Sequence, residues 1–156
     1  MLSGDGIGTS APREGNGGRR LGSDFSVLIS FNCKDRFLAE ALRASLFVLE
    51  PQLQFFLSPA SYGAVKFEEN VAQGIYEDDA MLSLVGPSGL SHWQEIEARI
   101  ALNRSRQDNS FSVVPVLAAG AARPTRSFLE SLNWIEIPVV TDRTALLWLI
   151  KAIKRC

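Results

Sequence analysis

The sequence is poor in cysteine and histidine, and it has no long apolar run. Its two cysteines, Cys33 and Cys156, lie far apart, and its single histidine is His92. This set favours neither a disulfide framework nor a zinc site, so we expect a reducing compartment, the cytoplasm, and no bound metal. No apolar stretch approaches the roughly 20 residues that would span a bilayer, so no membrane is expected as a partner.

An excess of positive charge is absent as well. The formal net charge is -1 at pH 7, whereas proteins that bind nucleic acid need a clustered basic surface to neutralise phosphates. Nucleic acid is therefore not an expected partner. The 46% hydrophobic content is typical of a soluble globular protein, and 156 residues give room for one domain of ordinary size.

The chain divides into two parts by composition. Residues 1–22 are rich in glycine, serine and arginine and have no apolar centre, which predicts a disordered tail or linker and no signal peptide. Residues 23–156 carry the regular apolar patterns of a folded domain.

Short β-rich runs alternate with helical spacing throughout this domain. The third run, AMLSLV, is almost wholly apolar, which predicts a strand in the middle of a sheet. The fourth contains Pro115, which has no N–H to donate, and this predicts an edge or strand-end position. The alternation predicts an α/β domain with a parallel sheet of five strands. These strands are predicted over residues 25–31, 53–57, 80–85, 111–117 and 134–137.

Helical spacing marks the segments between the strands. Asp35 is a candidate N-cap for a first helix and Ser91 for a third, which runs to about Arg104. A short helix is predicted at residues 127–132 and a final one, with a continuous apolar stripe, at residues 142–154. The first helix is defined by Phe37, Leu38, Ala41, Leu42, Ser45 and Leu46, and the second by Phe67, Val71 and Ile75.

The third helix carries one chemically unusual residue. Glu97 shares a face with Trp93, Ile96, Ile100 and Ala101 by i, i+3 and i+4 spacing. A carboxylate in an apolar stripe costs free energy unless it is paired, and partial burial would raise its pKa, as is common at functional sites. The alternative is that Glu97 lies at the edge of the stripe and caps backbone amides of a neighbouring loop.

Other polar residues of this helix are expected to do less. Glu95 and Arg99 form an i,i+4 pair on another face, which is typical of a solvated surface. His92, at the helix start, is interpreted as a surface residue. In open α/β sheets ligands bind outside the carboxyl ends of the strands. We therefore expect one pocket to be faced by residues 31–35, 58–65 and 86–93.

Several of these segments resemble a known family. The run GPSGLSHW at residues 86–93, followed by Glu97, looks like the third-strand-to-helix box of TIR domains, especially bacterial ones. Residues 25–31 (FSVLISF) are similar to the family's first box, and residues 113–117 (VVPVL) to its fourth strand. The resemblance covers most of residues 24–140 and implies a flavodoxin-like three-layer fold.

The resemblance implies an activity as well. In the NAD-cleaving branch of the family, a glutamate at the position of Glu97 cleaves the bond between nicotinamide and ribose, so NAD is the expected substrate and no cofactor is implied. Ordinary glycosidases need a second carboxyl group to protonate the leaving oxygen, whereas nicotinamide leaves from a pyridinium that is already cationic. The substrate-binding residues that the resemblance implies are Phe31, Asn32, Lys34, Asp35, Ser58, Tyr62 and Trp93.

Some of these residues have alternative interpretations. Core packing is the alternative for Phe31 and Trp93, and a solvated surface position is the alternative for Lys34. Residues 58–65 correspond to the family's BB loop, which commonly mediates assembly. This sequence departs from the pattern there, because two further residues follow Gly63 before Lys66.

Two other functions compete with NAD cleavage. A TIR domain can act only as an adaptor that binds other TIR domains, and an adaptor needs no glutamate at this position. A phosphoacceptor receiver domain shares the fold but requires an acidic residue at the end of the third strand, where this sequence has Leu84-Val85-Gly86. We therefore predict an NAD glycohydrolase of immune or cell-death signalling, such as antiviral defence, whose activity depends on homotypic self-association.

Overall fold

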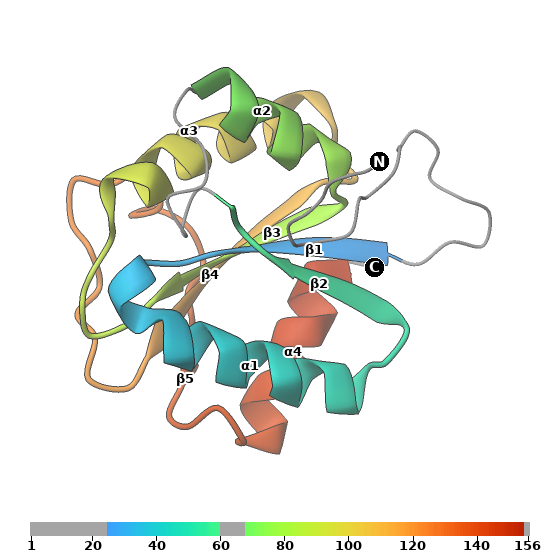
Figure 1. Ribbon diagram of the computed structural model, residues 1–156, viewed down its shortest axis with the longest axis vertical. Helices are drawn as coiled ribbons and strands as arrows, with labels where there is room; N and C mark the ends of the chain where they lie inside the picture. The colour runs from blue at the N-terminus through green and yellow to red at the C-terminus, as the bar shows by residue number, and fades with distance from the viewer. Residues whose placement is uncertain (1–24, 60–67, 155–156) are drawn as a thin grey trace, which may run out of the picture.

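The computed structural model describes residues 25–59 and 68–154, and for residues 68–70 only the backbone. Its elements are β1 (Phe25–Ser30), η1 (Cys33–Asp35), α1 (Arg36–Leu49), β2 (Leu53–Leu57), α2 (Glu68–Glu77), β3 (Ala80–Val85), α3 (His92–Gln107), β4 (Ser112–Ala118), β5 (Ile135–Ile137) and α4 (Arg143–Lys154). The strands form one parallel sheet in the order β2-β1-β3-β4-β5. Figure 1 shows α1 and α4 on one face of this sheet and α2 and α3 on the other. This is the predicted three-layer, flavodoxin-like α/β fold; the predicted tail, residues 1–22, lies outside the described residues.

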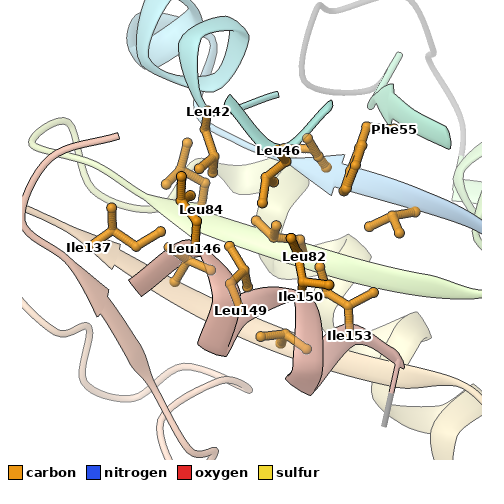
Figure 2. Close-up of a cluster of buried hydrophobic side chains, with 14 of the residues drawn as sticks. Leu42, Leu46, Phe55, Leu82, Leu84, Ile137, Leu146, Leu149, Ile150 and Ile153 are labelled. Carbon is orange, nitrogen blue, oxygen red and sulfur yellow. The ribbon is translucent and has the colours of Figure 1, made fainter. Parts of the chain in front are cut away.

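The two faces of the sheet bury two separate apolar clusters. Successive residues of a strand point to opposite faces, so Val27 and Ile29 of β1 join the cluster under α1 and α4, whereas Leu28 joins the one under α2 and α3. Ser30 therefore lies on the same face as Leu28, toward α3. Figure 2 shows the first cluster, where side chains of α1 and α4 meet those of the strands, among them Leu42, Leu46, Phe55, Leu82, Leu84, Leu149 and Ile153.

Several sequence predictions are confirmed in detail. All six residues of β3 are buried, and the strand lies in the middle of the sheet. Ser91 is the N-cap of α3. The stripe predicted for the last helix forms the buried side of α4, at Leu146, Leu149, Ile150 and Ile153.

The predicted edge position of Pro115 is wrong. β4 lies between β3 and β5, and it pairs with β3 along its length, from Ser112 opposite Ala80 to Leu117 opposite Val85. The β5 ladder begins only at Val116. Among the described strands, β4 therefore has no partner beside Pro115 on its β5 side, where a residue without an N–H interrupts no ladder.

The helix predicted at residues 127–132 is also wrong. This segment is a series of turns, with hydrogen bonds from Glu130 N to Ser127 O and from Leu132 N to Leu129 O. The Ser127 hydroxyl accepts a hydrogen bond from Leu129 N, and the Glu95 carboxylate accepts one from Phe128 N. These side-chain acceptors compete for the backbone donors, which favours turns over a helix.

The helix predicted from the spacing of residues 37–46 is confirmed as α1, but only some of the residues that define it are buried. Leu42 and Leu46 are buried as expected, but Phe37 is 76% exposed and Ala41 is exposed too. Ala39 takes the place of these two residues in the core. Leu38, Leu42 and Leu46 pack against the sheet, which leaves Phe37 on the solvent side of the helix. None of the described helices is both long enough and apolar enough to cross a membrane.

Candidate functional site

The first turn of α3 sets the position of the site. Ser91 and Gln94 form a capping box, in which Ser91 Oγ accepts from Gln94 N at 3.2 Å and Gln94 Oε1 accepts from Ser91 N at 3.0 Å. The amide nitrogen of the same Gln94 side chain donates to Leu84 O at 2.8 Å and to Ser30 O at 3.4 Å. One buried residue thus begins the helix and holds it on the carboxyl ends of β1 and β3.

Glu97 lies one turn further along α3 and is 1% exposed. Its Oε1 accepts a hydrogen bond from Ser30 Oγ at 2.6 Å, and its Oε2 accepts one from Ser58 Oγ. Ser30 ends β1, and Ser58 directly follows β2. The carboxylate therefore joins the carboxyl ends of two adjacent strands. In the described structure its donors are serine hydroxyls, and not the loop amides that the alternative interpretation required.

Burial controls the charge of Glu97. Loss of contact with water raises the pKa of the Glu97 carboxyl group from 4.5 to about 7, although the hydrogen bonds from Ser30 and Ser58 act to lower it. Among the described residues no lysine or arginine forms an ion pair with this carboxylate. At neutral pH, Glu97 is therefore divided between a charged and an uncharged form. A group in that state can act as an acid, as a base or as an anion that stabilises a developing cation.

The loops after β1 and β3 are tied together at the carboxyl edge of the sheet. Asn32 Nδ2 donates to Ser88 O at 3.3 Å and to Gly89 O at 3.2 Å. The carboxylate of Asp35 accepts from Ser88 N at 3.2 Å and from Ser88 Oγ at 3.0 Å. Asp35 occupies the N-cap position of α1, but its side chain makes no capping hydrogen bond. The predicted cap is wrong in this respect, because Ser88 occupies both carboxylate oxygens.

The predicted site residues do not all lie together. Ser58 is buried against Glu97, and Asn32 and Asp35 are buried in the segment after β1. Lys34, between the latter two, is exposed, and Tyr62 and residues 60–65 of the predicted pocket lie outside the described residues.

The two aromatic residues of the predicted site are on opposite faces of the sheet. Phe31 is fully buried in the cluster under α1 and α4, away from Glu97. Trp93 is half-buried and packs against the cluster under α2 and α3, with its ring 5.8 Å from that of the exposed His92. Core packing thus describes Phe31 fully, whereas Trp93 lies on the same helix as Glu97, one turn before it.

Sequence reasoning missed Ser30, Gln94 and Ser83. Ser30 and Ser83 are register neighbours on β1 and β3, and both are fully buried. The Ser83 hydroxyl has no hydrogen-bond partner among the described residues. The available signal was a serine inside each apolar strand run, at the alternating position that faces the third helix.

Glu95 differs from Glu97 in its surroundings. It is partly exposed and accepts hydrogen bonds from Ser127 Oγ at 3.0 Å and from Phe128 N at 3.4 Å. The prediction of a fully solvated face is therefore wrong for Glu95, because the segment after β4 folds over it. Its role in the described structure is to hold that segment against α3.

The fold and the site together define a class of protein. The sheet is flavodoxin-like and parallel, and Glu97 is hydrogen-bonded at its carboxyl edge, the edge outside which ligands bind in open α/β domains. The family model of the TIR domain matches residues 27–146, and the chain belongs to this family. A search of curated proteins finds no match to the chain.

Proposed function

We propose that this TIR domain cleaves NAD at the bond between nicotinamide and ribose, with Glu97 as the catalytic carboxylate. The observation that carries the proposal is the burial of Glu97 between two serine hydroxyls at the carboxyl edge of the sheet. The TIR family includes members that cleave NAD, and the match over residues 27–146 supports the same activity here.

The arrangement suits a reaction that needs a single carboxylate. When the glycosidic C–N bond breaks, its electron pair moves to the ring nitrogen and neutralises the pyridinium, so nicotinamide leaves without a proton from the protein. The ribose is left as an oxocarbenium ion, and an ionised Glu97 stabilises that positive charge. Water then adds to the anomeric carbon and loses a proton, which yields ADP-ribose. Capture by a nitrogen of the adenine ring in place of water yields a cyclic isomer.

The serine hydroxyls explain how a buried carboxylate could accept a substrate. Ser30 and Ser58 present O–H donors to opposite oxygens of Glu97. The ribose of NAD carries two neighbouring hydroxyl groups, which are donors of the same kind. Exchange of Ser58 for ribose would keep the carboxylate hydrogen-bonded throughout, so that binding leaves no buried acceptor unsatisfied.

Other residues of the site have supporting roles in this proposal. Asn32 and Asp35 hold the loops after β1 and β3 in register, and Trp93 supplies an apolar wall. Lys34 is exposed near the start of α1 and is available to the pyrophosphate of NAD. We further propose that activity depends on self-association between TIR domains, in immune or cell-death signalling.

The test is turnover of NAD by concentrated purified protein, with the products separated by chromatography. The wild type should release nicotinamide, and Glu97→Gln should reduce the rate by a factor of about 1,000 or more, as expected when the main electrostatic stabiliser of a transition state is lost. Circular dichroism should show that the variant remains folded. The matched control is Glu95→Gln, which retains an acceptor oxygen for Ser127 and should cleave NAD at the wild-type rate.

The competing function is that of an adaptor that binds other TIR domains without chemistry. A wild type that stays inert when it is assembled on a scaffold, or a Glu97→Gln variant as active as the wild type, would refute the catalytic role. The adaptor function would then be the better description.

A further inference from the structure

A buried hydroxyl group in the middle of the sheet has no hydrogen-bond partner in the described structure. It belongs to Ser83, which is fully buried. The other five residues of β3 are apolar and buried as well. Burial of an unpaired hydroxyl costs free energy, so an alanine at this position would suit the fold better. Such groups are rare in folded proteins, and a functional role is one reason for their retention.

Ser83 is the last of three serines that lie in a row across adjacent strands. Ser30 of β1 is paired in register with Ser83 of β3. On the other side of β1, Ile29 is paired with Leu57, and Ser58 N donates to Ile29 O at 2.8 Å, which places Ser58 beside Ser30. Neighbouring strands are about 4.8 Å apart, and residues paired in this way point to the same face. We call Ser58, Ser30 and Ser83 the serine row.

The serine row lies under α3, and Glu97 uses two of its three hydroxyl groups. Ser30 Oγ donates to Glu97 Oε1, and Ser58 Oγ donates to Glu97 Oε2. Ser83 faces the same layer, because Met81, two residues earlier on β3, packs in the cluster under α2 and α3. A carboxylate can accept about four hydrogen bonds. Glu97 therefore has room to accept the third hydroxyl.

The carboxylate can change donors without movement of its helix. The side-chain amide of Gln94 donates to Leu84 O and to Ser30 O, which fixes α3 across β3 and β1. Glu97 lies one turn further along, and its carboxylate ends a side chain with three rotatable bonds. Rotation about these bonds carries the carboxylate along the serine row, from the side of β2 toward β3.

We propose that Ser83 is a positioning residue for Glu97, a reserve hydroxyl that donates to the carboxylate when Ser58 no longer does. The inference rests on the proposed function, in which the ribose of NAD displaces Ser58. A hydrogen bond from Ser83 favours the charged carboxylate, which is the form that stabilises the oxocarbenium ion. Ser83 keeps its proton throughout and does not contact the substrate.

The unpaired hydroxyl of the free protein is consistent with this role. Ser83→Ala would remove a group that costs stability, but it would also remove the reserve donor of Glu97. Stability and activity should therefore respond to this substitution in opposite directions, as is common at functional sites.

The first experiment needs no NAD and follows the titration of Glu97 in the full chain by carbon-13 NMR. Removal of the Ser58 hydroxyl imitates its displacement by substrate. Ser83→Ala alone should leave the titration of Glu97 unchanged. Added to Ser58→Ala, it should lower the ionisation constant of Glu97 at least about threefold further, as expected for the loss of one hydrogen bond.

The matched control for the double variant is Ser58→Ala with Ser112→Ala. Ser112 is also buried, but its hydroxyl donates to Ile153 O at 3.1 Å. This control should titrate like Ser58→Ala. The inference is overturned if Ser83→Ala has no effect in the Ser58→Ala chain. It is also overturned if Ser83→Ala alone shifts the titration, because the hydroxyl would then already be bound to Glu97 in the free protein.

The second experiment measures NAD cleavage by wild type and Ser83→Ala over a range of pH. The pH dependence of kcat/KM reports ionisation in the free enzyme, and that of kcat reports ionisation in the complex with substrate. Ser83→Ala should leave the acidic limb of kcat/KM in place and move that of kcat to higher pH. On that limb kcat should fall at least about threefold, and at higher pH it should return to the wild-type value.

The two experiments separate this inference from the proposed function. A wild type that cleaves NAD, with the same kcat profile in Ser83→Ala, overturns the inference and leaves the function intact. A wild type that releases no nicotinamide refutes the function and, with it, the use of Ser83 in catalysis. The titration of Glu97 still decides in that case whether Ser83 is its reserve donor.

Discussion

Ser30 Oγ donates a hydrogen bond to Glu97 Oε1 at 2.6 Å, and this contact joins β1 to α3. Both residues are buried, and on the far oxygen of the same carboxylate Ser58 donates a second hydrogen bond. The two hydroxyls lower the pKa that burial raises, so the pKa of Glu97 settles at about 7. The balance between burial and hydrogen bonding at this one group leads to three of the four predictions below.

The raised pKa of Glu97 makes the stability of the fold depend on pH. The carboxyl group ionises near pH 4.5 in the unfolded chain and near pH 7 in the folded chain. Between these values the folded state binds one proton more, so the free energy of unfolding should fall as pH rises through this window. It should fall by at most about 3 kcal/mol and become level above the window. Urea denaturation at a series of pH values measures it.

Glu97→Gln is the control for this pH dependence. The glutamine cannot ionise, so the variant should lack the loss of stability between pH 4.5 and 7 and should be more stable than the wild type at higher pH. If wild type and variant lose stability in parallel over this range, the folded-state pKa of Glu97 is not raised.

Removal of the Ser58 hydroxyl should raise the pKa of Glu97 further. The hydrogen bond from Ser58 favours the charged carboxylate, so Ser58→Ala should move the titration of Glu97 to higher pH. Carbon-13 NMR of the labelled glutamate carboxyl groups measures this titration directly. Ser58→Thr, which retains a hydroxyl, should titrate close to the wild type. A Ser58→Ala titration at lower pH than that of the wild type would contradict the assigned hydrogen bond.

Ser30 and Ser83 provide a matched pair of substitutions. They are register neighbours with equal burial, but only the Ser30 hydroxyl is hydrogen-bonded within the described structure. Ser30→Ala should destabilise the fold by about 1–3 kcal/mol above pH 7, because it leaves a buried carboxylate short of a donor. Ser83→Ala should be neutral or stabilising by up to about 1 kcal/mol, because it removes an unpaired buried hydroxyl. Equal losses for the two variants in urea denaturation would contradict this distinction.

The close approach of Gly86 to Asp35 should make Gly86→Ala destabilising. A Cβ at Gly86 would lie 2.7 Å from Asp35 Oδ2 and 2.8 Å from Asp35 Cγ. Asp35 cannot move aside without loss of its hydrogen bonds from Ser88, so we expect a cost of about 1–3 kcal/mol in thermal or urea denaturation.

A double-mutant cycle tests the cause of that cost. In a chain that already carries Asp35→Ala, the two atoms nearest to the new methyl group are gone while Leu38 Cδ2 remains at 3.0 Å, so Gly86→Ala should have a smaller effect. If the glycine were needed for another reason, the losses in free energy of unfolding from the two substitutions would simply add in the double variant.

The fold was predictable from the sequence wherever an apolar pattern is compatible with only one position in the fold. β3 was placed correctly because a wholly apolar run fits only the middle of a parallel sheet, and Ser91 because its hydroxyl has helix amides to bind. The position of Pro115 and the conformation of residues 127–132 were predicted wrongly, because both depend on residues distant in sequence. Pro115 is tolerated where it lies because the β5 ladder begins only after it, and residues 127–132 form turns in contact with the Glu95 carboxylate.

By itself the sequence determined the α/β class, the family resemblance and the choice of Glu97 over Glu95, because helical periodicity alone separates those two carboxylates. Only the tertiary structure decided which groups surround Glu97. Ser30 ends β1 and Ser58 directly follows β2, and their convergence on Glu97 of α3 depends on strand order and on the face to which each side chain points. The pKa of about 7 for Glu97 follows from that convergence. Burial and hydrogen bonding depend on tertiary packing, so a local sequence pattern does not predict them.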